Sequence, residues 1–145
     1  MSLFSLLSVS GSGMGAQRLR AQLLVENLAN AETTRTPEGG PYRRKDAVFA
    51  SEPQSSPFAA EFQTQLLDGA AGVSVAEIVE DTREPLKRYL PGHPDAGPDG
   101  YVAFPRISPA EDMVDLLNAT RNYQANVSAV AAVRDMIHRT LDLLR

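Results

Sequence analysis

Residues 108–145 have the sequence SPAEDMVDLLNATRNYQANVSAVAAVRDMIHRTLDLLR, and this segment decides the fold. Ser108, Pro109 and Glu111 predict a helix start, because they supply an N-cap residue, a proline at the first helical position and the returning carboxylate of a capping box. After Pro109 the segment contains neither glycine nor proline. Acidic side chains lie near its start and basic ones near its end, as the helix dipole favours. The sequence therefore predicts one continuous helix, about 55 Å long at roughly 1.5 Å per residue.

The apolar side chains of this helix predict a partner helix. They follow a four-and-three spacing, interrupted at Arg134, that is typical of a coiled-coil seam. The seam residues are Leu116, Thr120, Tyr123, Val127, Val130, Ile137, Leu141 and Leu144. Residues 125–133 are apolar almost all round the helix, with only Asn126 and Ser128 as polar members. Because one partner covers only one face, this belt predicts further packing against other subunits.

Residues 16–31 predict the partner helix. Their apolar positions recur at intervals of three and four, at Leu19, Ala21, Leu24, Val25 and Leu28. Whether the helix extends back through residues 1–15 stays open, because each of Gly11, Gly13 and Gly15 costs about 1 kcal/mol relative to alanine in a helix. We therefore expect a mainly α fold with a small β insertion, in which long N- and C-terminal helices pair as an antiparallel coiled coil.

The segment between the helices has a different character. Nine of the ten prolines lie in it, and short β-prone runs occur at residues 43–50, 73–81, 86–90 and 101–104. Residues 51–72 mix proline and serine with weak apolar character, which predicts a flexible loop. We expect one structural unit with an N-terminal helical segment (1–31), a loop and short-strand region (32–107) and a C-terminal long helix (108–145).

Length and composition restrict the class of protein. A chain of 145 residues with 43% hydrophobic and 22% charged residues is expected to fold as one domain. Its 14 basic and 18 acidic side chains give a net charge of -4, which disfavours binding to nucleic acid. Without cysteine, disulfides and thiolate sites are excluded. The sequence contains no run of 18 apolar residues, so no transmembrane helix is predicted. The N-terminal residues lack the basic region of a cleavable signal peptide, so we expect none.

Motifs that carry chemistry are weak. Residues 11–16 (GSGMGA) match a loose dinucleotide-binding pattern, but no second strand can be placed at residues 32–45, so we interpret the glycines as a flexible start or a close-packing surface. His93 lies in a predicted turn. His138 lies one helical turn after Asp135 without a third metal ligand in sight. The basic run at residues 43–45 is interpreted as a solvated strand edge. We expect no catalytic, cofactor or metal site.

Two sequence signatures resemble those of a known family. Residues 27–31 (NLANA), followed by Thr33, Thr34 and residues 36–39 (TPEG), resemble the N-terminal signature of the axial proteins of the bacterial flagellum. Residues 121–126 (RNYQAN) resemble their C-terminal counterpart. Residues 40–43 (GPYR), 91–96 (PGHPDA) and 100–102 (GYV) resemble a short basal-body rod member. The resemblance covers about residues 11–50 and 75–145, and Gly97 and Pro98 depart from it.

The resemblance implies a non-catalytic structural subunit of the proximal rod, the shaft that crosses the periplasm and transmits motor torque. It implies contacts with copies of itself, with other rod proteins and with the export-gate adaptor at the rod base. It also implies export by the flagellar type III apparatus without signal cleavage. In this family the terminal segments tend to be disordered in the free subunit and to order on assembly.

We expect fourteen residues to serve helix pairing and subunit packing. These are Leu24, Asn27, Leu28, Asn30, Leu116, Tyr123, Gln124, Ala125, Asn126, Val127, Val130, Val133, Ile137 and Leu141. Two alternatives remain open on the residues alone. One is a cytoplasmic helical-hairpin adaptor or scaffold, which predicts a stable dimer in dilute solution, and the other is a small nucleotide-binding enzyme.

Overall fold

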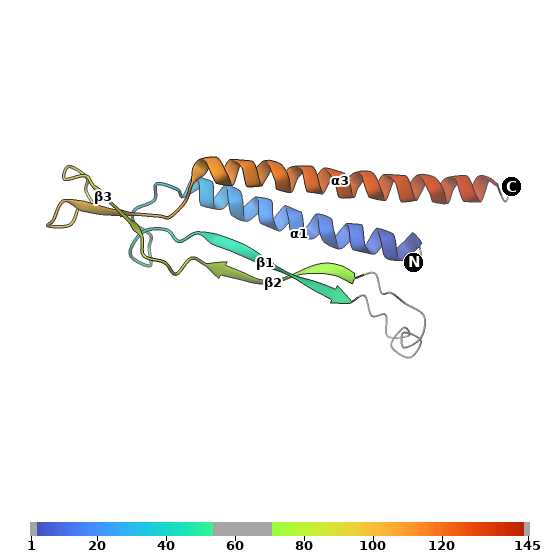
Figure 1. Ribbon diagram of the computed structural model, residues 1–145, viewed down its shortest axis with the longest axis horizontal. Coiled ribbons are helices and arrows are strands. Elements are labelled where there is room, and N and C mark those ends of the chain that lie inside the picture. Colours follow the sequence, from blue (N-terminus) through green and yellow to red (C-terminus); the bar gives the residue numbers. More distant parts are fainter. Residues whose placement is uncertain (1–2, 54–70, 144–145) are drawn as a thin grey trace.

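The computed structural model describes residues 3–53 and 71–143. Its elements follow in the order α1 (Leu3–Ala29), β1 (Lys45–Pro53), β2 (Ala71–Glu80), β3 (Leu86–Tyr89), β4 (Tyr101–Phe104) and α3 (Pro109–Asp142). The two long helices run antiparallel, and α1 lies between α3 and the β1–β2 pair (Figure 1). The prediction of two long terminal helices around a small β part is confirmed.

Helix α1 is continuous from Leu3 and crosses all three glycines. A Cβ atom on Gly13 would lie 3.2 Å from the Asn126 side chain, so this glycine permits a close approach between the helices. The helix contacts α3 on one side and both strands of the first pair on another. This packing offsets the low helix propensity of glycine, which the sequence alone left undecided.

Helix α3 begins where the sequence predicts, with Ser108 at the N-cap and a proline in its first turn. The expected capping box is wrong in one respect, because the Ser108 side chain makes no capping hydrogen bond. The Asp112 N–H instead donates to the Ser108 carbonyl oxygen at 3.0 Å, so backbone geometry closes the first turn. The helix then runs without interruption to Asp142.

The seam that α3 turns toward α1 differs from the predicted one. Thr120, Tyr123, Val127 and Leu141 are exposed, and Leu144 lies outside the described residues. The buried or half-buried positions on this face are Asp112, Leu116, Ala119, Asn126, Val130, Val133 and Ile137. The sequence pattern weights large apolar residues, whereas the small Ala119 and the Asn126 beside Gly13 permit the helices to lie closer together.

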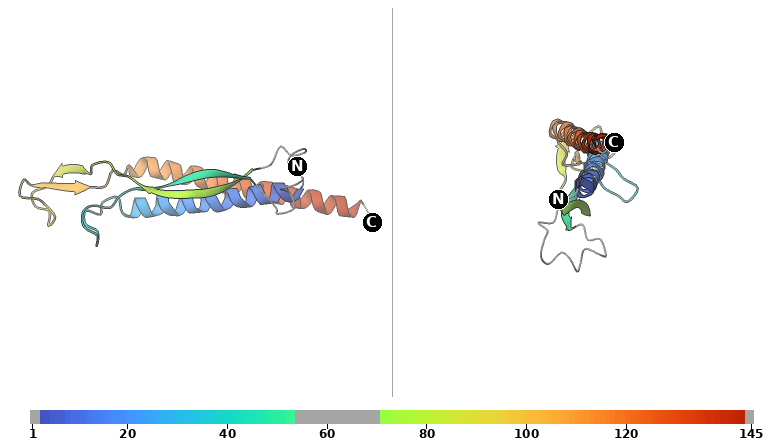
Figure 2. Two further views of the ribbon diagram at one scale, coloured as in Figure 1. Left: turned by 90° about the horizontal axis from the view of Figure 1, so that it is seen from below. Right: turned by 90° about the vertical axis from the view of Figure 1, so that its right-hand side faces the viewer.

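Strands β1 and β2 form an antiparallel pair that lies along α1 (Figure 2). Their register shifts between Val48 and Phe49, and the Val73 N–H donates to the Ser12 hydroxyl oxygen at 3.0 Å, which ties β2 to α1. Pro53 pairs with Ala71, so strands occupy both ends of the segment expected as a loop at residues 51–72. Residues 54–70 of that predicted loop lie outside the described residues.

Strands β3 and β4 form a second antiparallel pair in which Leu86 pairs with Phe104 and Tyr89 with Tyr101. We call residues 86–104 the arm, because they extend beyond the helices at the end opposite to the chain termini (Figure 1). Phe104 is buried beneath Arg88, whose guanidinium lies 4.9 Å from the ring centroid. A hydrogen bond of 2.7 Å from the Thr34 hydroxyl to the Asp95 carboxylate ties the arm to the loop after α1.

Gly100 fixes the turn of the arm. Its φ is +75°, a conformation that side-chain-bearing residues rarely adopt, and a Cβ atom there would lie 2.8 Å from the Tyr89 ring. We predict that Gly100→Ala destabilises the arm by about 2 kcal/mol through backbone strain and displacement of Tyr89. Hydrogen exchange of the amides of residues 86–104 measures the effect. Gly92→Ala is the matched control, since its Cβ meets nothing within 4 Å. Equal protection in the two variants would contradict the prediction.

Candidate assembly interface

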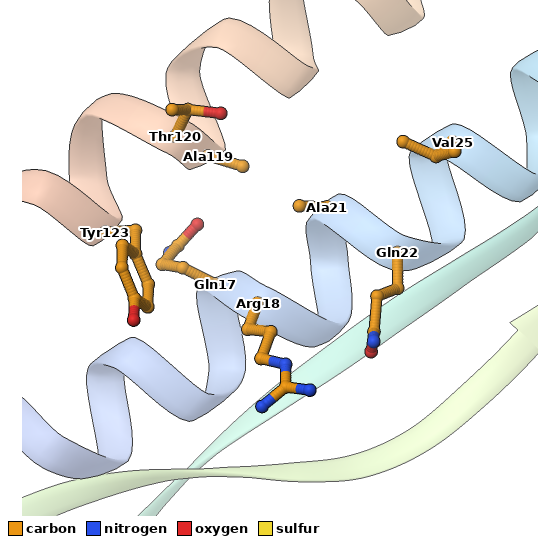
Figure 3. A pocket seen from close by; sticks show the side chains of 8 residues that line it. All are labelled: Gln17, Arg18, Ala21, Gln22, Val25, Ala119, Thr120 and Tyr123. Carbon is orange, nitrogen blue, oxygen red and sulfur yellow. The ribbon is translucent and has the colours of Figure 1, made fainter.

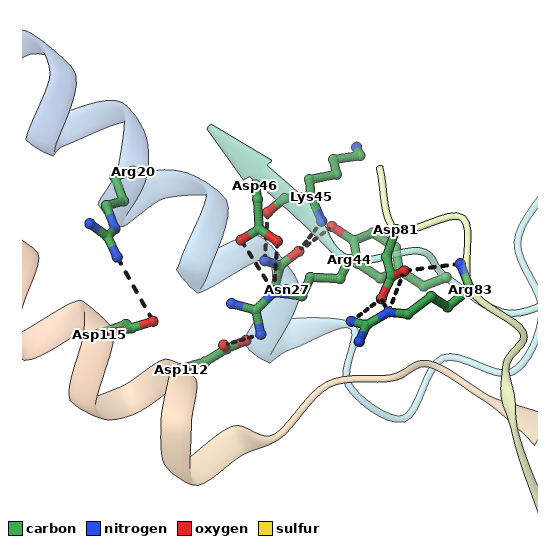
Figure 4. Close-up of polar contacts among 10 residues, drawn as sticks. Arg20, Asn27, Arg44, Lys45, Asp46, Asp81, Arg83, Asp112 and Asp115 are labelled. Atoms are coloured by element: carbon green, nitrogen blue, oxygen red, sulfur yellow. Dashed lines mark hydrogen bonds and ion pairs between the residues drawn. The ribbon is translucent and has the colours of Figure 1, made fainter. Parts of the chain in front are cut away.

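Asn27 is a buried polar anchor at the end of α1, with 0% of its surface exposed. Its Oδ1 accepts hydrogen bonds from the Lys45 N–H at 2.9 Å and from the Tyr42 hydroxyl at 3.1 Å, while its Nδ2 donates to the Lys45 carbonyl oxygen at 2.9 Å (Figure 4). Because the amide both donates to and accepts from the backbone of Lys45, it fixes where β1 starts beside the helix. The first of the two sequence signatures therefore contains a fold-determining contact.

The side chains around this anchor support its hydrogen bonds. Burial, with the nearby Glu26 charge, raises the pKa of Tyr42 to about 12, so its hydroxyl stays protonated and donates to Asn27. The Lys45 ammonium donates to the Glu26 carboxylate at 2.8 Å, and this hydrogen bond raises the pKa of Lys45. The end of α1 is thus tied to β1 through both backbone and side chain.

Arg44 and Asp112 form an ion pair that connects the start of β1 with the first turn of α3. The guanidinium Nη1 lies 2.7 Å from the carboxylate, whose side chain is 0% exposed (Figure 4). Neither carboxylate oxygen accepts an aligned hydrogen bond from a described residue, so the Arg44 charge is the main compensation for its burial. Burial raises the pKa of Asp112 despite the opposing attraction of Arg44.

Two further ion pairs lie near this contact. Arg20 and Asp115 join α1 to α3 at 3.9 Å, with both side chains substantially exposed. In the connection after β2, hydrogen bonds from Arg83 lower the pKa of Asp81 to about 2. All of these contacts lie at the end of the helix pair that is nearest to the arm (Figure 4).

An open groove of about 540 Å³ lies along the junction of the two helices. Its lining, shown in Figure 3, is mostly apolar, with Arg18 as its charged member. We call this feature the groove, and its lining residues are Gln17, Arg18, Ala21, Gln22, Val25, Ala119, Thr120 and Tyr123. Val25 is 51% exposed, so the helix pair leaves apolar surface in contact with solvent.

Much of the remaining surface of α3 is also apolar. Leu117 is 59% exposed. The other large exposed apolar side chains of this helix are Met113, Val114, Tyr123, Val127, Met136 and Leu141. Exposed apolar residues along a whole helix are typical of surfaces that other proteins cover.

The weak chemical motifs lie in places that do not assemble a site. Residues 11–16 are inside α1, without the strand and turn of a dinucleotide-binding unit. His93 lies in the arm, where its Nδ1 accepts a hydrogen bond from the Asp95 N–H, and His138 is exposed on α3. Within residues 3–53 and 71–143, no group of three or more His, Cys, Asp or Glu side chains could hold a metal ion. No helix in the described part of the chain is long and apolar enough to cross a membrane.

Comparison with known proteins identifies the family. Residues 99–143 match the family described as flagellar basal body rod FlgEFG protein C-terminal. Flagellar basal-body rod protein FlgC of Borreliella burgdorferi is 39% identical over 152 aligned positions, covering 100% of this chain and 99% of the relative. The FlgC proteins of Bacillus subtilis and Escherichia coli are 38% and 36% identical, each covering 99% of this chain and 99% and 98% of the relatives. This chain belongs to the FlgC family of flagellar basal-body rod proteins.

The resemblance noted in the two signatures is thus confirmed over nearly the full length. As a FlgC-family protein, the chain is a structural rod subunit of the flagellar basal body. The functional surface of such a subunit is the surface that it presents to its neighbours. The groove and the exposed apolar side chains of α3 are among the apolar surfaces that the described residues leave open to such contacts.

The residues expected to serve packing fall into two groups. One group lies at the contacts within the subunit, buried or half-buried: Leu24, Asn27, Leu28, Asn30, Leu116, Asn126, Val130, Val133 and Ile137. The other group is exposed on α3: Tyr123, Gln124, Ala125, Val127 and Leu141. The structure thus brings the first group together within one chain, and it leaves the second group on the outside of the helix pair.

Sequence reasoning missed the Arg44–Asp112 pair. The interpretation of residues 43–45 as a solvated strand edge is wrong for Arg44, whose side chain is only 18% exposed. Asp112 was assigned to the positive end of the helix dipole, which explains its position in the first turn but not its burial. The two residues are far apart in sequence, so no local spacing pairs them.

The role of Asn27 can be tested by replacing its side-chain amide. We predict that Asn27→Asp lowers the free energy of unfolding by about 2–3 kcal/mol, because it removes the donor to the Lys45 carbonyl and buries a charge beside it. Urea unfolding followed by circular dichroism measures the loss. Asn30→Asp is the matched control, since Asn30 is only partly buried and is expected to cost less than about 1 kcal/mol. Comparable losses would mean that Asn27 is not an anchor.

The Arg44–Asp112 pair predicts a pH dependence. Arg44→Met leaves a buried carboxylate without compensation, which should cost about 3–5 kcal/mol at pH 7. Because the pKa of Asp112 is raised in the folded chain, the carboxyl takes up its proton there before it does in the unfolded chain. Lowering the pH from 7 to 4 should therefore recover part of the lost stability.

Unfolding free energies measured at several pH values test this prediction. Arg20→Met serves as the control, because its exposed ion pair with Asp115 at 3.9 Å should contribute less than about 1 kcal/mol at any pH. A variant of Arg44 that loses no more stability than the control, or that weakens further on acidification relative to it, would rule out the assigned role.

Proposed function

We propose that this chain is a non-catalytic building block of the proximal rod, the part of the flagellar drive shaft that transmits motor torque through the periplasm. The observation that carries the proposal is the exposed apolar surface along the helix pair, on α3 and in the groove. An isolated subunit gains nothing from this surface. A subunit in a shaft buries it against neighbours, at about 25 cal/mol per Å² of apolar area.

Torque transmission requires stiffness, and stiffness follows from helices that interlock between many subunits. Each added contact buries further apolar area while the antiparallel pair keeps its own geometry. The cost of assembly is the ordering of side chains and chain ends at each contact. Stability of the shaft is therefore a property of the assembly more than of the single chain.

We infer the neighbours from the family. Copies of this chain and other rod proteins would cover the lateral surfaces, and the export-gate adaptor would meet the rod base. The chain would reach the periplasm through the flagellar type III export apparatus, without removal of a signal peptide. Terminal segments that order only on assembly would keep the residues 125–133 belt from associating before delivery.

Two other functions make different predictions. A cytoplasmic adaptor built from the same helix pair would be a stable dimer in dilute solution. A nucleotide-binding enzyme would bind a dinucleotide, and binding would be lost on mutation of Gly13. The position of Gly13 against Asn126, where it serves helix packing, gives no support to the second alternative.

The deciding experiment is electron microscopy of basal bodies, with a motility assay, in a strain that lacks this gene and in the same strain after its return. We predict that rods and motility are lost and that the gene restores both. A strain expressing an unrelated axial protein from the same promoter is the control. Intact rods in the deletion strain would refute the proposal and favour the adaptor.

A further inference from the structure

The groove combines an apolar lining with a cation that no described residue pairs. Ala21, Val25, Ala119 and Tyr123 supply the apolar part of the lining. Arg18, which also lines the groove, has no ion pair with any residue in the described ranges. An exposed, unpaired cation on the rim of an open apolar groove indicates a surface that a further chain can cover.

The chemistry of the groove defines its occupant. An elongated channel between two helices fits a third helix, and its apolar lining requires small or apolar side chains along that helix. The exposed guanidinium of Arg18 can pair with a carboxylate at the edge of the same helix.

Helix α3 carries such a surface on its outside. We call it the outer stripe, with Ala125, Ala129, Ala132 and Met136 spaced at four, three and four residues and all exposed. Asp135 flanks the stripe, is exposed and has no ion pair with any described residue. At about 100° per residue the outer stripe lies on the side of α3 roughly opposite to the groove residues Thr120 and Tyr123. One copy can therefore use both surfaces at once.

We propose that the groove of one copy receives the outer stripe of α3 from a second copy, with the Asp135 carboxylate of that copy paired to Arg18. This inference rests on the proposed function, and it names the partner and the contact that sets the register. Because the two surfaces are different, the contact is head-to-tail and repeats from copy to copy instead of closing into a two-fold dimer.

The direction of the helices sets the axial offset between the two copies. Helices α1 and α3 run antiparallel within a subunit, so a neighbour in the same orientation presents its α3 antiparallel to the first α1. Within one copy Gly13 lies beside Asn126, which places Arg18 level with position 121 of its own α3. Asp135 is about fourteen residues further along, so the pairing predicts an axial stagger of about 21 Å between neighbours.

Charge reversal tests the pairing. Arg18→Glu and Asp135→Arg should each reduce the amount of this chain in isolated basal bodies at least tenfold, and the double variant should restore it. Lys87→Glu, on the exposed face of the arm, is the matched control and should leave incorporation unchanged. Single variants that incorporate normally, or a double variant that is no better than the singles, would overturn the proposal.

Cysteine cross-linking provides a second measurement, because the sequence contains no native cysteine. Within one copy Gln22 and Ala132 lie at different heights and on different sides of the helix pair, so a disulfide between Gln22→Cys and Ala132→Cys must join two copies. We expect a ladder of multimers from oxidised basal bodies, and none from either single variant or from Gln22→Cys combined with Lys87→Cys. Assembled rods without the ladder would contradict the contact.

The outcomes separate this inference from the function on which it rests. If the deletion strain retains rods, the rod function itself fails. If the deletion strain lacks rods while the charge variants and the cysteine pair behave as wild type, the function stands and the groove has another occupant. A cross-link from Gln22→Cys to a different rod protein would identify that occupant and refute the second copy.

Discussion

The packing of α1 against both α3 and the β1–β2 pair is the interaction on which the rest of the structure depends. In the described part of the chain, α1 is the only helix or strand that contacts both α3 and the β1–β2 pair, and it lies between them (Figure 2). The side chains that it buries are few and mostly small or aliphatic, namely Ala16, Leu23 and Leu24, together with Asn27. Such a core permits two helices to lie close together, but it removes little apolar surface from water. The elongated shape and the large exposed apolar surface are consequences of this arrangement.

Polar contacts supply the specificity that so small a core does not. Asn27 fixes where β1 begins, and the Arg44–Asp112 pair ties the first turn of α3 to that point. Both depend on one geometry, because a buried amide or carboxylate without its partner costs more than the contact contributes. A small shift of the helices would separate the partners of these hydrogen bonds and of this ion pair. The contacts therefore hold the helix pair in one register.

The sequence predicts the elements of this fold well and their contacts less well. Ser108, Pro109 and the absence of later glycine or proline identify α3, and local β propensity places all four strands. The continuity of α1 through Gly11, Gly13 and Gly15 could not be predicted, since it depends on tertiary packing that propensity does not include. The predicted seam of α3 is wrong at Thr120, Tyr123, Val127 and Leu141, because the size of an apolar side chain indicates burial only where small residues do not bring the helices close together.

In the candidate site, the family signature identifies Asn27. The Arg44–Asp112 pair joins distant segments, so no local sequence pattern indicates it. The belt at residues 125–133, which the sequence predicts to be covered on more than one face, accounts only for Val127 among the large exposed apolar side chains of α3, and the others lie on either side of it. The groove could not be predicted, because it results from the crossing of α1 and α3, including the small Ala21 and Ala119. Sequence pattern thus indicates that a surface exists, while its shape requires the packed helices.

Stability within the subunit is graded along its length, and this grading suits assembly. The anchoring contacts of Asn27 and Arg44 lie at the end of the helix pair near the arm, whereas the rest of the pair combines the three glycines of α1 with the exposed Leu141. Local opening therefore costs least at the chain termini and most near the arm. A neighbour that covers the free end adds burial where the subunit itself supplies least. Under the proposed rod function, assembly would add rigidity first at the chain termini, because the free chain opens most easily there.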